Sequence, residues 1–306
     1  MKKIIFILIT GITISTIQAQ EIRDALRYSQ ENLNGTARFR AMSGAFGALG
    51  GDLSSINVNP AGSAIFANNQ LGFTLNNTSL TNNSNFFDNS TNTKDSSLDL
   101  NQAGGVFVFK NQNKLSDWKK FSIAINFENT NILNNTIFSA GTNPTNSIAN
   151  YFLYYANGVT LNVLENSNYD ELGHGAQQAF LGYQAYIINP VNTNPNNSNY
   201  TSNVPASGNY YQENSITTKG YNGKVSFNAA TSYKDKIYFG LNLNSHFVDF
   251  RQSSIFYEDN NAPLTNNYTV SRVQFNNDLY TYGTGFSFQL GTIAKVTKQL
   301  RLGIAF

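Results

Sequence analysis

The sequence contains no cysteine and little charge. The absence of cysteine among the 306 residues excludes disulfide bonds, thiolate zinc sites and cysteine nucleophiles. Charged residues make up 12% of the chain, whereas ordinary globular proteins carry about 25%. The net charge is only +2, so the sequence offers no excess of cations for the phosphates of a nucleic acid.

Asparagine and aromatic residues take the place of charge. The chain has 47 asparagine, 23 phenylalanine and 17 tyrosine residues. Disordered chains have few aromatics and a high net charge, so this composition predicts a folded protein. Mean hydropathy is -0.31, and no apolar run after residue 20 approaches the length of a spanning helix. These two features exclude a helical membrane protein.

The first residues have the layout of a secretory signal peptide. Met1-Lys2-Lys3 is a positive start, an almost entirely apolar stretch follows up to Ile17, and a small residue precedes the expected cleavage site after Ala19. We therefore interpret residues 1–19 as a signal peptide and expect the mature chain to work outside the cytoplasm. An uncleaved membrane anchor is the alternative. No cysteine stands at the cleavage point, which argues against a lipoprotein anchor.

Residues 237–247 alternate between apolar and polar side chains. Apolar residues fall on odd positions and polar or small residues mostly on even ones, which predicts a β-strand with two unlike faces. The apolar row is Ile237, Phe239, Leu241, Leu243 and Phe247, and the polar row includes Asn242, Asn244 and His246. This alternation outlasts the average soluble strand of about five or six residues. It is long enough to cross a bilayer, which takes about nine to eleven residues.

The same alternation recurs along the chain and predicts seven strands. Their ranges are 70–77, 98–109, 120–129, 219–233, 237–250, 273–294 and 300–306. Long connections (78–97, 130–218 and 251–272) take turns with shorter ones (110–119, 234–236 and 295–299). Outer-membrane barrels have this asymmetry, with short periplasmic turns and long outer loops. We therefore predict an all-β, transmembrane antiparallel β-barrel over residues 70–306, with a secreted soluble β protein as the alternative.

The number of predicted strands is odd, whereas single-chain bacterial barrels close with an even number. An unclosed edge leaves backbone groups unpaired in lipid. We therefore expect the 306 residues to be the N-terminal part of a longer barrel. The terminal Phe306 ends an apolar row, which is also the kind of end that barrel-insertion machinery recognises.

A glycine-rich segment precedes the first predicted strand. Residues 20–69 show no strand alternation, and the stretch 35–52 is rich in glycine and other small residues. The tetrapeptide Asn59-Pro60-Ala61-Gly62 follows. Taken alone, Asn-Pro is a common turn. Glycine permits close packing and unusual dihedral angles, as a compact plug inside a barrel requires.

The order of signal peptide, glycine-rich segment, Asn59-Pro60-Ala61 and first strand resembles the FadL/TodX family of outer-membrane transporters for hydrophobic compounds. The resemblance is strongest over residues 35–66, extends to the strand layout and does not reach the Asn-rich loops. It implies that residues 20–69 are an N-terminal hatch inside a fourteen-stranded barrel, of which about seven strands are present. It further implies that Asn59, Pro60 and Ala61 take part in gating, and that the protein passively imports long-chain fatty acids or aromatic hydrocarbons.

The longest predicted connection contains two helical patterns. Residues 147–157 and 170–188 are typical of helices, and Asn189-Pro190 ends the second. The resemblance implies that an external loop of this kind captures the hydrophobic ligand. The candidate capture residues are Tyr151, Phe152, Tyr155, Phe180, Tyr183 and Ile187. The alternative is that these residues pack only against each other.

The sequence gives little support for catalysis. Its only histidines, His174 and His246, lie on a predicted loop helix and on the polar face of a strand. There is no G-x-S-x-G motif and no histidine pair with metal-ligand spacing. We expect no enzyme, no metal and no cofactor, but a monomer of the bacterial outer membrane that contacts membrane lipid, a hydrophobic small molecule and the insertion machinery. A surface adhesin or a structural porin without gated transport is the alternative function.

Overall fold

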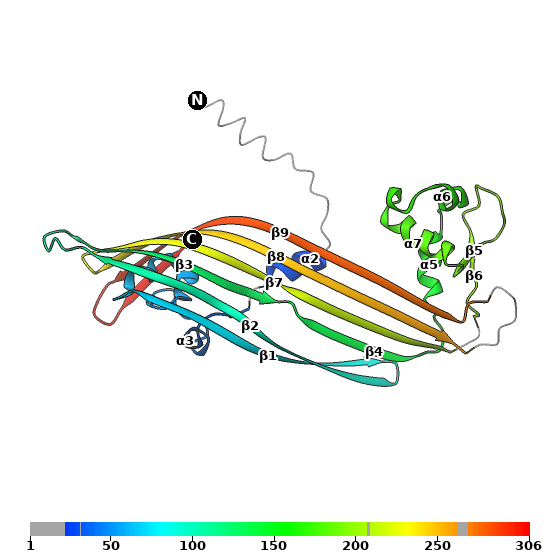
Figure 1. Cartoon of the computed structure of the whole chain (residues 1–306), viewed down its shortest axis with the longest axis horizontal. Coiled ribbons are helices and arrows are strands. Elements are labelled where there is room, and N and C mark those ends of the chain that lie inside the picture. The colour runs from blue at the N-terminus through cyan, green and yellow to red at the C-terminus, as the bar shows by residue number, and fades with distance from the viewer. Residues whose placement is uncertain (1–21, 31, 207–208, 262–268) are drawn as a thin grey trace, which may run out of the picture.

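The computed structural model describes residues 22–30, 32–206, 209–261 and 269–306. The predicted signal peptide at 1–19 lies outside the described residues. Most of the described chain forms one antiparallel sheet that curls into a half-barrel (Figure 1). No helix among the described residues has both the length and the apolar character needed to span a membrane.

Seven strands form the path β1-β2-β3-β7-β8-β9-β10, each antiparallel to its neighbour. Their bounds are β1 Gln70–Phe86, β2 Asn89–Lys110, β3 Trp118–Ile132, β7 Tyr210–Tyr233, β8 Ile237–Asn260, β9 Arg272–Lys295 and β10 Arg301–Ala305. An eighth strand, β4 (Asn135–Asn143), follows β3 and pairs with the first half of β7. Each of the seven predicted strands is therefore present, in an open half-barrel.

The strands extend beyond the predicted ranges on the side of the long connections. Residues 78–97 are not a long loop, as predicted, but strand on both sides of a short turn at Phe87 and Asp88. Likewise, β8 continues to Asn260 and β7 begins at Tyr210. The prediction is wrong here because both faces of these extensions carry mostly polar residues, so no apolar row marks them as strand.

The connection between β4 and β7 folds into a small helical module beyond one end of the sheet, which we call the upper end (Figure 1). It contains α5 (Ala149–Ala156), α6 (Leu161–Asn166), η2 (Tyr169–Glu171), α7 (His174–Gln184), β5 (Ile188–Pro190) and β6 (Tyr200–Ser202). The helix predicted over 147–157 is confirmed as α5. The helix predicted over 170–188 is wrong in extent, because Tyr186 adopts a left-handed φ of 56° and Ile188 begins a strand.

The described residues before β1 form helical turns and contain no strand. These turns are α2 (Ile22–Ser29), α3 (Ala37–Ala41), α4 (Ser55–Val58) and η1 (Pro60–Ile65). Residues 53–66 pack on one face of the sheet through two small clusters, in which Ile56 contacts the area around Val106, and Ala61 contacts the area around Tyr238. We call this the inner face, and the opposite one the outer face.

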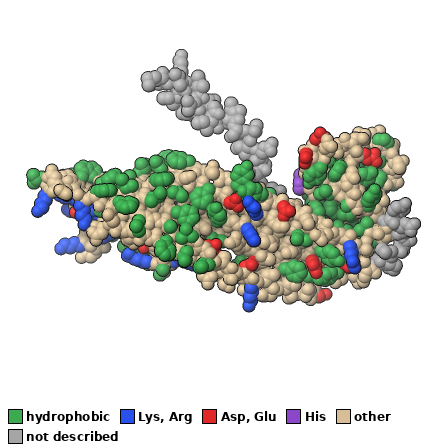
Figure 2. Space-filling view, viewed as in Figure 1, with side chains coloured by type: hydrophobic (Ala, Val, Ile, Leu, Met, Phe, Trp, Pro, Cys, Tyr) green, Lys and Arg blue, Asp and Glu red, His purple; other side chains and the backbone are tan. Residues whose placement is uncertain are grey.

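The two faces of the sheet reverse the polarity of a soluble protein. Along β8, the inner residues Asn242 and Asn244 are at most 6% exposed, whereas the outer residues Phe239, Leu241 and Leu243 are at least 37% exposed. Outer residues of the neighbouring strands behave alike: Phe107, Ile123, Ile125, Phe227, Phe286 and Phe288. Hydrophobic side chains gather over the half of the sheet away from the helical module (Figure 2). The apolar and polar faces predicted for residues 237–247 are therefore confirmed.

Candidate functional site

The Asn59-Pro60-Ala61 turn is buried against β8 and β9. Asn59 caps η1, because its Oδ1 accepts a hydrogen bond from the Ala61 N–H at 3.1 Å. Pro60 occupies the first position of η1, where its missing N–H costs nothing. The Asn59 Nδ2 donates to the Gly47 carbonyl oxygen at 2.8 Å and lies 3.2 Å from the Thr292 carbonyl oxygen of β9. One side chain therefore joins the turn to the glycine-rich segment and to the sheet.

Three glycines on adjacent strands make room for this turn. Gly240 of β8 and Gly291 of β9 are directly paired, and Gly303 lies on β10. A Cβ would stand 2.2 Å from the Pro60 carbonyl carbon at Gly240, and 2.1 Å from the Asn59 Oδ1 at Gly291. A Cβ at Gly303 would stand 2.1 Å from a backbone oxygen of the glycine-rich segment. Sequence reasoning missed this glycine seat, although glycine in three successive strands marks places of close backbone approach.

Side-chain amides of the inner face bind carbonyl groups of the N-terminal segment. Asn228 donates to the Pro60 carbonyl oxygen at 2.9 Å, and Asn242 donates to the Ile56 carbonyl oxygen at 2.8 Å. Short helical turns leave many carbonyls without a main-chain partner, and buried carbonyls need one. The asparagine on the inner face thus holds the segment in place.

A polar cavity of about 280 Å³ lies where the N-terminal segment meets β3 and β7. Its wall includes Glu128 and Lys224, which are directly paired across the two strands with Nζ and Oε2 3.9 Å apart. His246 is the next residue in the same inner row, and its Nε2 lies 2.8 Å from the Ser287 hydroxyl oxygen. His246 therefore lies on the polar face of the strand, as predicted, and this face is the inner one. This part of the inner wall is therefore polar and ionisable.

All six candidate capture residues lie in the helical module, but with different exposure. Phe152 and Ile187 are 1% and 6% exposed and belong to the module's apolar core. Tyr151, Phe180 and Tyr183 are half-buried against that core. The sixth, Tyr155, is half-buried and contacts the rings of Tyr151, Tyr154 and His174. Ile187 follows α7 rather than lying on it, contrary to the helix predicted over 170–188.

One apolar cavity of about 370 Å³ lies between the module and the sheet. Tyr151 and Ile148 line it from the module, and Phe256 and Phe275 line it from β8 and β9. Sequence reasoning missed both phenylalanines. They are directly paired on the inner face. In the sequence, Phe256 is recognisable as an apolar residue in the same alternate row of β8 as Asn242 and Asn244.

Comparison with protein-family models, with curated proteins and with solved structures finds no match for this chain.

Within the described ranges, no group of three or more His, Asp or Glu side chains is placed to hold a metal ion.

A buried carboxylate attaches the module to the sheet. Glu258 of β8 is 1% exposed and accepts hydrogen bonds from the Ser147 hydroxyl, from the Ile148 N–H at 2.7 Å and from the Gln212 Nε2 at 2.7 Å. Two of these donors lie at the start of α5. The side chain therefore joins β7 and β8 to the first helix of the module.

Replacement of Glu258 by alanine is expected to loosen the module. The substitution removes the Glu258 acceptor from the half-buried Ser147 hydroxyl and Ile148 N–H, at a cost of about 1–3 kcal/mol for each unsatisfied group. Gln212 Nε2 keeps only its hydrogen bond to the Asn146 carbonyl oxygen. Hydrogen exchange of the α5 amides should speed up by at least about tenfold, since 1.4 kcal/mol is a factor of ten. Glu213→Ala is the matched control, because Glu213 lies on the outer face of β7 and its Oε1 binds only the Tyr211 hydroxyl at 2.8 Å. Equal exchange in both variants would contradict this role.

Tyr200 of β6 is expected to lose its phenolic proton at a higher pH than an ordinary tyrosine. Burial, with smaller contributions from Tyr183 and Glu165, raises its pKa from 10.0 to about 12. Because the folded pKa lies above the unfolded one, Tyr200 stabilises the module below pH 10.0, and this contribution is lost as the pH rises towards 12. Phenolate absorbance should show a late step that Tyr200→Phe removes. A loss of phenolate absorbance near pH 10.0 in the variant, with the late step unchanged, would show that the pKa of Tyr200 is not raised.

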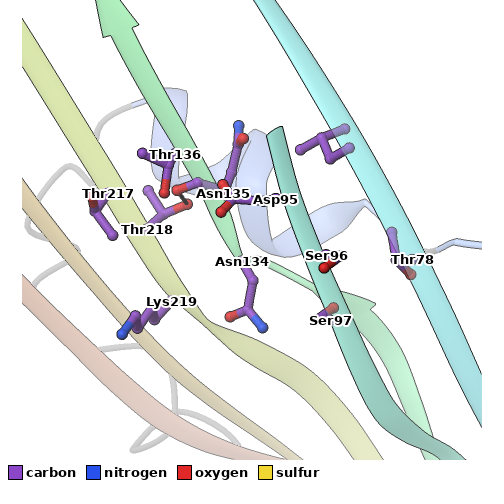
Figure 3. Close-up of a pocket in the computed structure, with 11 residues that line it drawn as sticks. Thr78, Asp95, Ser96, Ser97, Asn134, Asn135, Thr136, Thr217, Thr218 and Lys219 are labelled. Atoms are coloured by element: carbon purple, nitrogen blue, oxygen red, sulfur yellow. Dashed lines mark hydrogen bonds between the residues drawn. The ribbon is translucent and has the colours of Figure 1, made fainter. Parts of the chain in front are cut away.

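The hydrogen-bond ladder of the sheet is interrupted between β2 and β4. β2 pairs with β3 only over 102–110, and β4 pairs with β7. Side chains bridge the interruption, as where the Thr93 hydroxyl donates to the Thr136 carbonyl oxygen at 2.7 Å. A cavity of about 370 Å³ remains, in which Asp95, Asn135 and Thr136 lie close together (Figure 3). All the residues that line it are polar or charged except Leu80.

Proposed function

We propose that this protein is a passive outer-membrane transporter for hydrophobic small molecules, and that its N-terminal segment is a hatch. Long-chain fatty acids or aromatic hydrocarbons are the substrate class. The single observation that carries the proposal is the reversed polarity of the sheet, whose outer face is apolar and whose inner face is rich in buried amides.

The outer apolar face fits a bilayer in height. Leaving apolar side chains in water forgoes about 25 cal/mol per Å², whereas lipid covers them without a second protein layer. The outer run of β8 from Ile237 to Phe247 extends about 33 Å at about 3.3 Å per residue. A strand tilt of about 40° reduces this to about 25 Å, which is the height of the apolar band of outer-membrane barrels.

Aromatic residues at both limits of this band support the same placement. Tyr221 and Tyr282 flank Asp249 in one row across β7, β8 and β9. At the lower limit, Trp118 packs on Tyr233 with ring centroids 5.2 Å apart. Tyrosine and tryptophan prefer the boundary between lipid and water. Above the Tyr221 row, the outer positions become polar, as expected where the sheet leaves the membrane.

The free edges of the half-barrel support closure by further strands. Within the described residues, β1 pairs with β2 alone and β10 with β9 alone. A strand edge in lipid leaves N–H and C=O groups without partners, which is too costly to persist. We propose that further strands pair with both edges and complete a barrel of fourteen, as the family resemblance implies.

The way in which the Asn59-Pro60-Ala61 turn is held against the sheet supports its role as a hatch. The turn is held by amide–carbonyl hydrogen bonds and by contacts of small residues with glycines of the sheet. These contacts are local, so the turn can leave its seat without breaking the strand ladder. Release of the turn would open the lumen along the polar inner wall. The mechanism uses no cofactor and no ATP.

The apolar cavity beside Tyr151 is the part of the candidate capture site that a ligand can reach. Phe152 and Ile187 support it from the module's core rather than contacting the ligand. Uptake there is driven by burial of the ligand's apolar surface. The compact core of the module also favours the second candidate, a surface adhesin whose module binds a host or a neighbouring cell.

Uptake of a fluorescent fatty acid into liposomes that contain the closed barrel, with the strands that pair with β1 and β10, tests the proposal. We expect uptake by the wild-type protein, faster uptake by Asn59→Ala because its hatch is loosened, and slower uptake after deletion of residues 140–190. Equal rates in all three proteins would remove gated transport. Adhesion without uptake would favour the adhesin. A mature protein that stays dissolved and monodisperse without detergent would contradict the membrane placement itself.

A further inference from the structure

Two cations stand side by side on the outer face, directly above the Tyr221 row. Lys219 of β7 is paired with Arg251 of β8, and Arg251 is paired with Tyr280 of β9. Both cations are exposed. Like charges directly opposite each other destabilise a sheet, and within the part of the chain that the structure describes Lys219 forms no ion pair. An anion bound between Lys219 and Arg251 would relieve this repulsion.

A carboxylate lies one row farther from the apolar band. Thr217, Ser253 and Asp278 form that row, two residues along each strand from the row of cations. A cavity of about 550 Å³ connects the two rows. Two residues advance a strand by about 6.6 Å along its own direction. The order from the apolar band outward is therefore aromatic hydroxyls, cations, then a carboxylate.

The second carboxylate near the cations is already engaged. Asp249 Oδ1 lies 4.0 Å from the Arg251 Nε, and its Oδ2 accepts a hydrogen bond from the Tyr280 hydroxyl at 2.8 Å. The Arg251 guanidinium also lies over the Tyr280 ring, 4.6 Å from its centroid. These contacts hold Arg251 in place while its side chain stays 69% exposed. Arginine so placed presents N–H groups suited to phosphate oxygens.

We propose that this cluster binds the phosphoethanolamine headgroup of a membrane lipid. Lys219 and Arg251 bind the phosphate, which lies next to the acyl chains, and Asp278 binds the ammonium group, which lies farther out. The headgroup thus carries the two charges in the order in which the two rows follow one another along the strands. This inference rests on the proposed membrane placement, because the acyl chains of such a lipid lie along the apolar outer face.

Native mass spectrometry of the full chain, released from vesicles of mixed lipids, tests the inference. Insertion is checked first, by flotation with the vesicles; a chain that does not float refutes the membrane placement and with it the headgroup site. With the inserted chain, we expect phosphatidylethanolamine to be retained over phosphatidylglycerol and phosphatidylcholine. Lys219→Gln with Arg251→Gln should weaken retention about tenfold, the effect of losing about 1.4 kcal/mol. Asp278→Asn should abolish only the preference over phosphatidylglycerol.

Arg272→Gln is the matched control, because Arg272 lies on the same face of β9, farther from the apolar band, and its Nε pairs with Asp259 at 3.1 Å. It should retain the lipid as the wild type does. Equal retention of all three lipids by an inserted chain would overturn the headgroup site and leave the transport proposal standing. Loss of retention in Arg272→Gln, or displacement of the lipid by inorganic phosphate alone, would overturn it as well.

Discussion

A disulfide between positions 63 and 122 is expected to stop uptake of the hydrophobic ligand, and reduction is expected to restore it. Ser63 of η1 and Ser122 of β3 are both fully buried, with hydroxyl oxygens 3.1 Å apart. Serine-to-cysteine changes nearly preserve shape, and Ser63→Cys with Ser122→Cys places two thiols within reach of a bond of about 2.05 Å. The bond would fix the N-terminal segment to the wall of the half-barrel.

The protein has no cysteine of its own, so the two introduced thiols can form no other disulfide within the chain. Each single variant is the control, since one thiol alone forms no intramolecular bond and should transport as the wild type does. Uptake is measured in liposomes before and after addition of a reductant, with the crosslink followed by its altered migration on a gel. Undiminished uptake by the fully oxidised double variant would show that the segment does not gate transport.

Gly291→Ala is expected to lift the Asn59 turn from its seat and to give uncontrolled uptake. The new Cβ would stand 2.1 Å from the Asn59 Oδ1 and 2.7 Å from the Pro60 ring. The proline ring and the backbone are rigid, so the overlap is relieved only by moving the turn. Overpacking of this kind costs about 1–3 kcal/mol, which corresponds to about a 5- to 150-fold shift in the docking equilibrium.

Gly285→Ala provides the comparison on the same strand and the same face. Its Cβ would lie 3.7 Å from the nearest atom, the His246 Cβ, which is an ordinary contact. Uptake rate and protease sensitivity of residues 53–66 should both rise in Gly291→Ala and stay unchanged in Gly285→Ala. A Gly291→Ala protein with normal uptake and normal protease resistance would mean that the seat is not needed for closure.

The strands of the apolar band could be predicted from the sequence because their side chains face two unlike surroundings. Alternation along 237–247 placed Leu241 and Asn242 on opposite faces, which is confirmed: Leu241 is exposed on the outer face and Asn242 is buried on the inner face. The upper extensions of the strands could not be predicted in this way. Around Ser253 and Thr217, polar residues occupy both faces, so the period that reveals a strand is absent although the backbone pairing continues.

The candidate site was predictable only in part, for a similar reason. The Asn59-Pro60-Ala61 motif is local, so the sequence was sufficient to single it out. Its partners Gly240 and Gly291 lie far along the chain, and a glycine in a strand has many uses. Glu258 is likewise one acidic residue among several until the fold buries it beside the start of α5.

Local pattern by itself determined the strands of the apolar band and which of their side chains share a face, because backbone period and side-chain chemistry act between near neighbours. Tertiary structure alone decided where the N-terminal segment docks, which aromatics line a cavity rather than fill a core, and where like charges meet across strands. Those outcomes depend on register and curvature, which bring together residues that no short stretch of sequence relates.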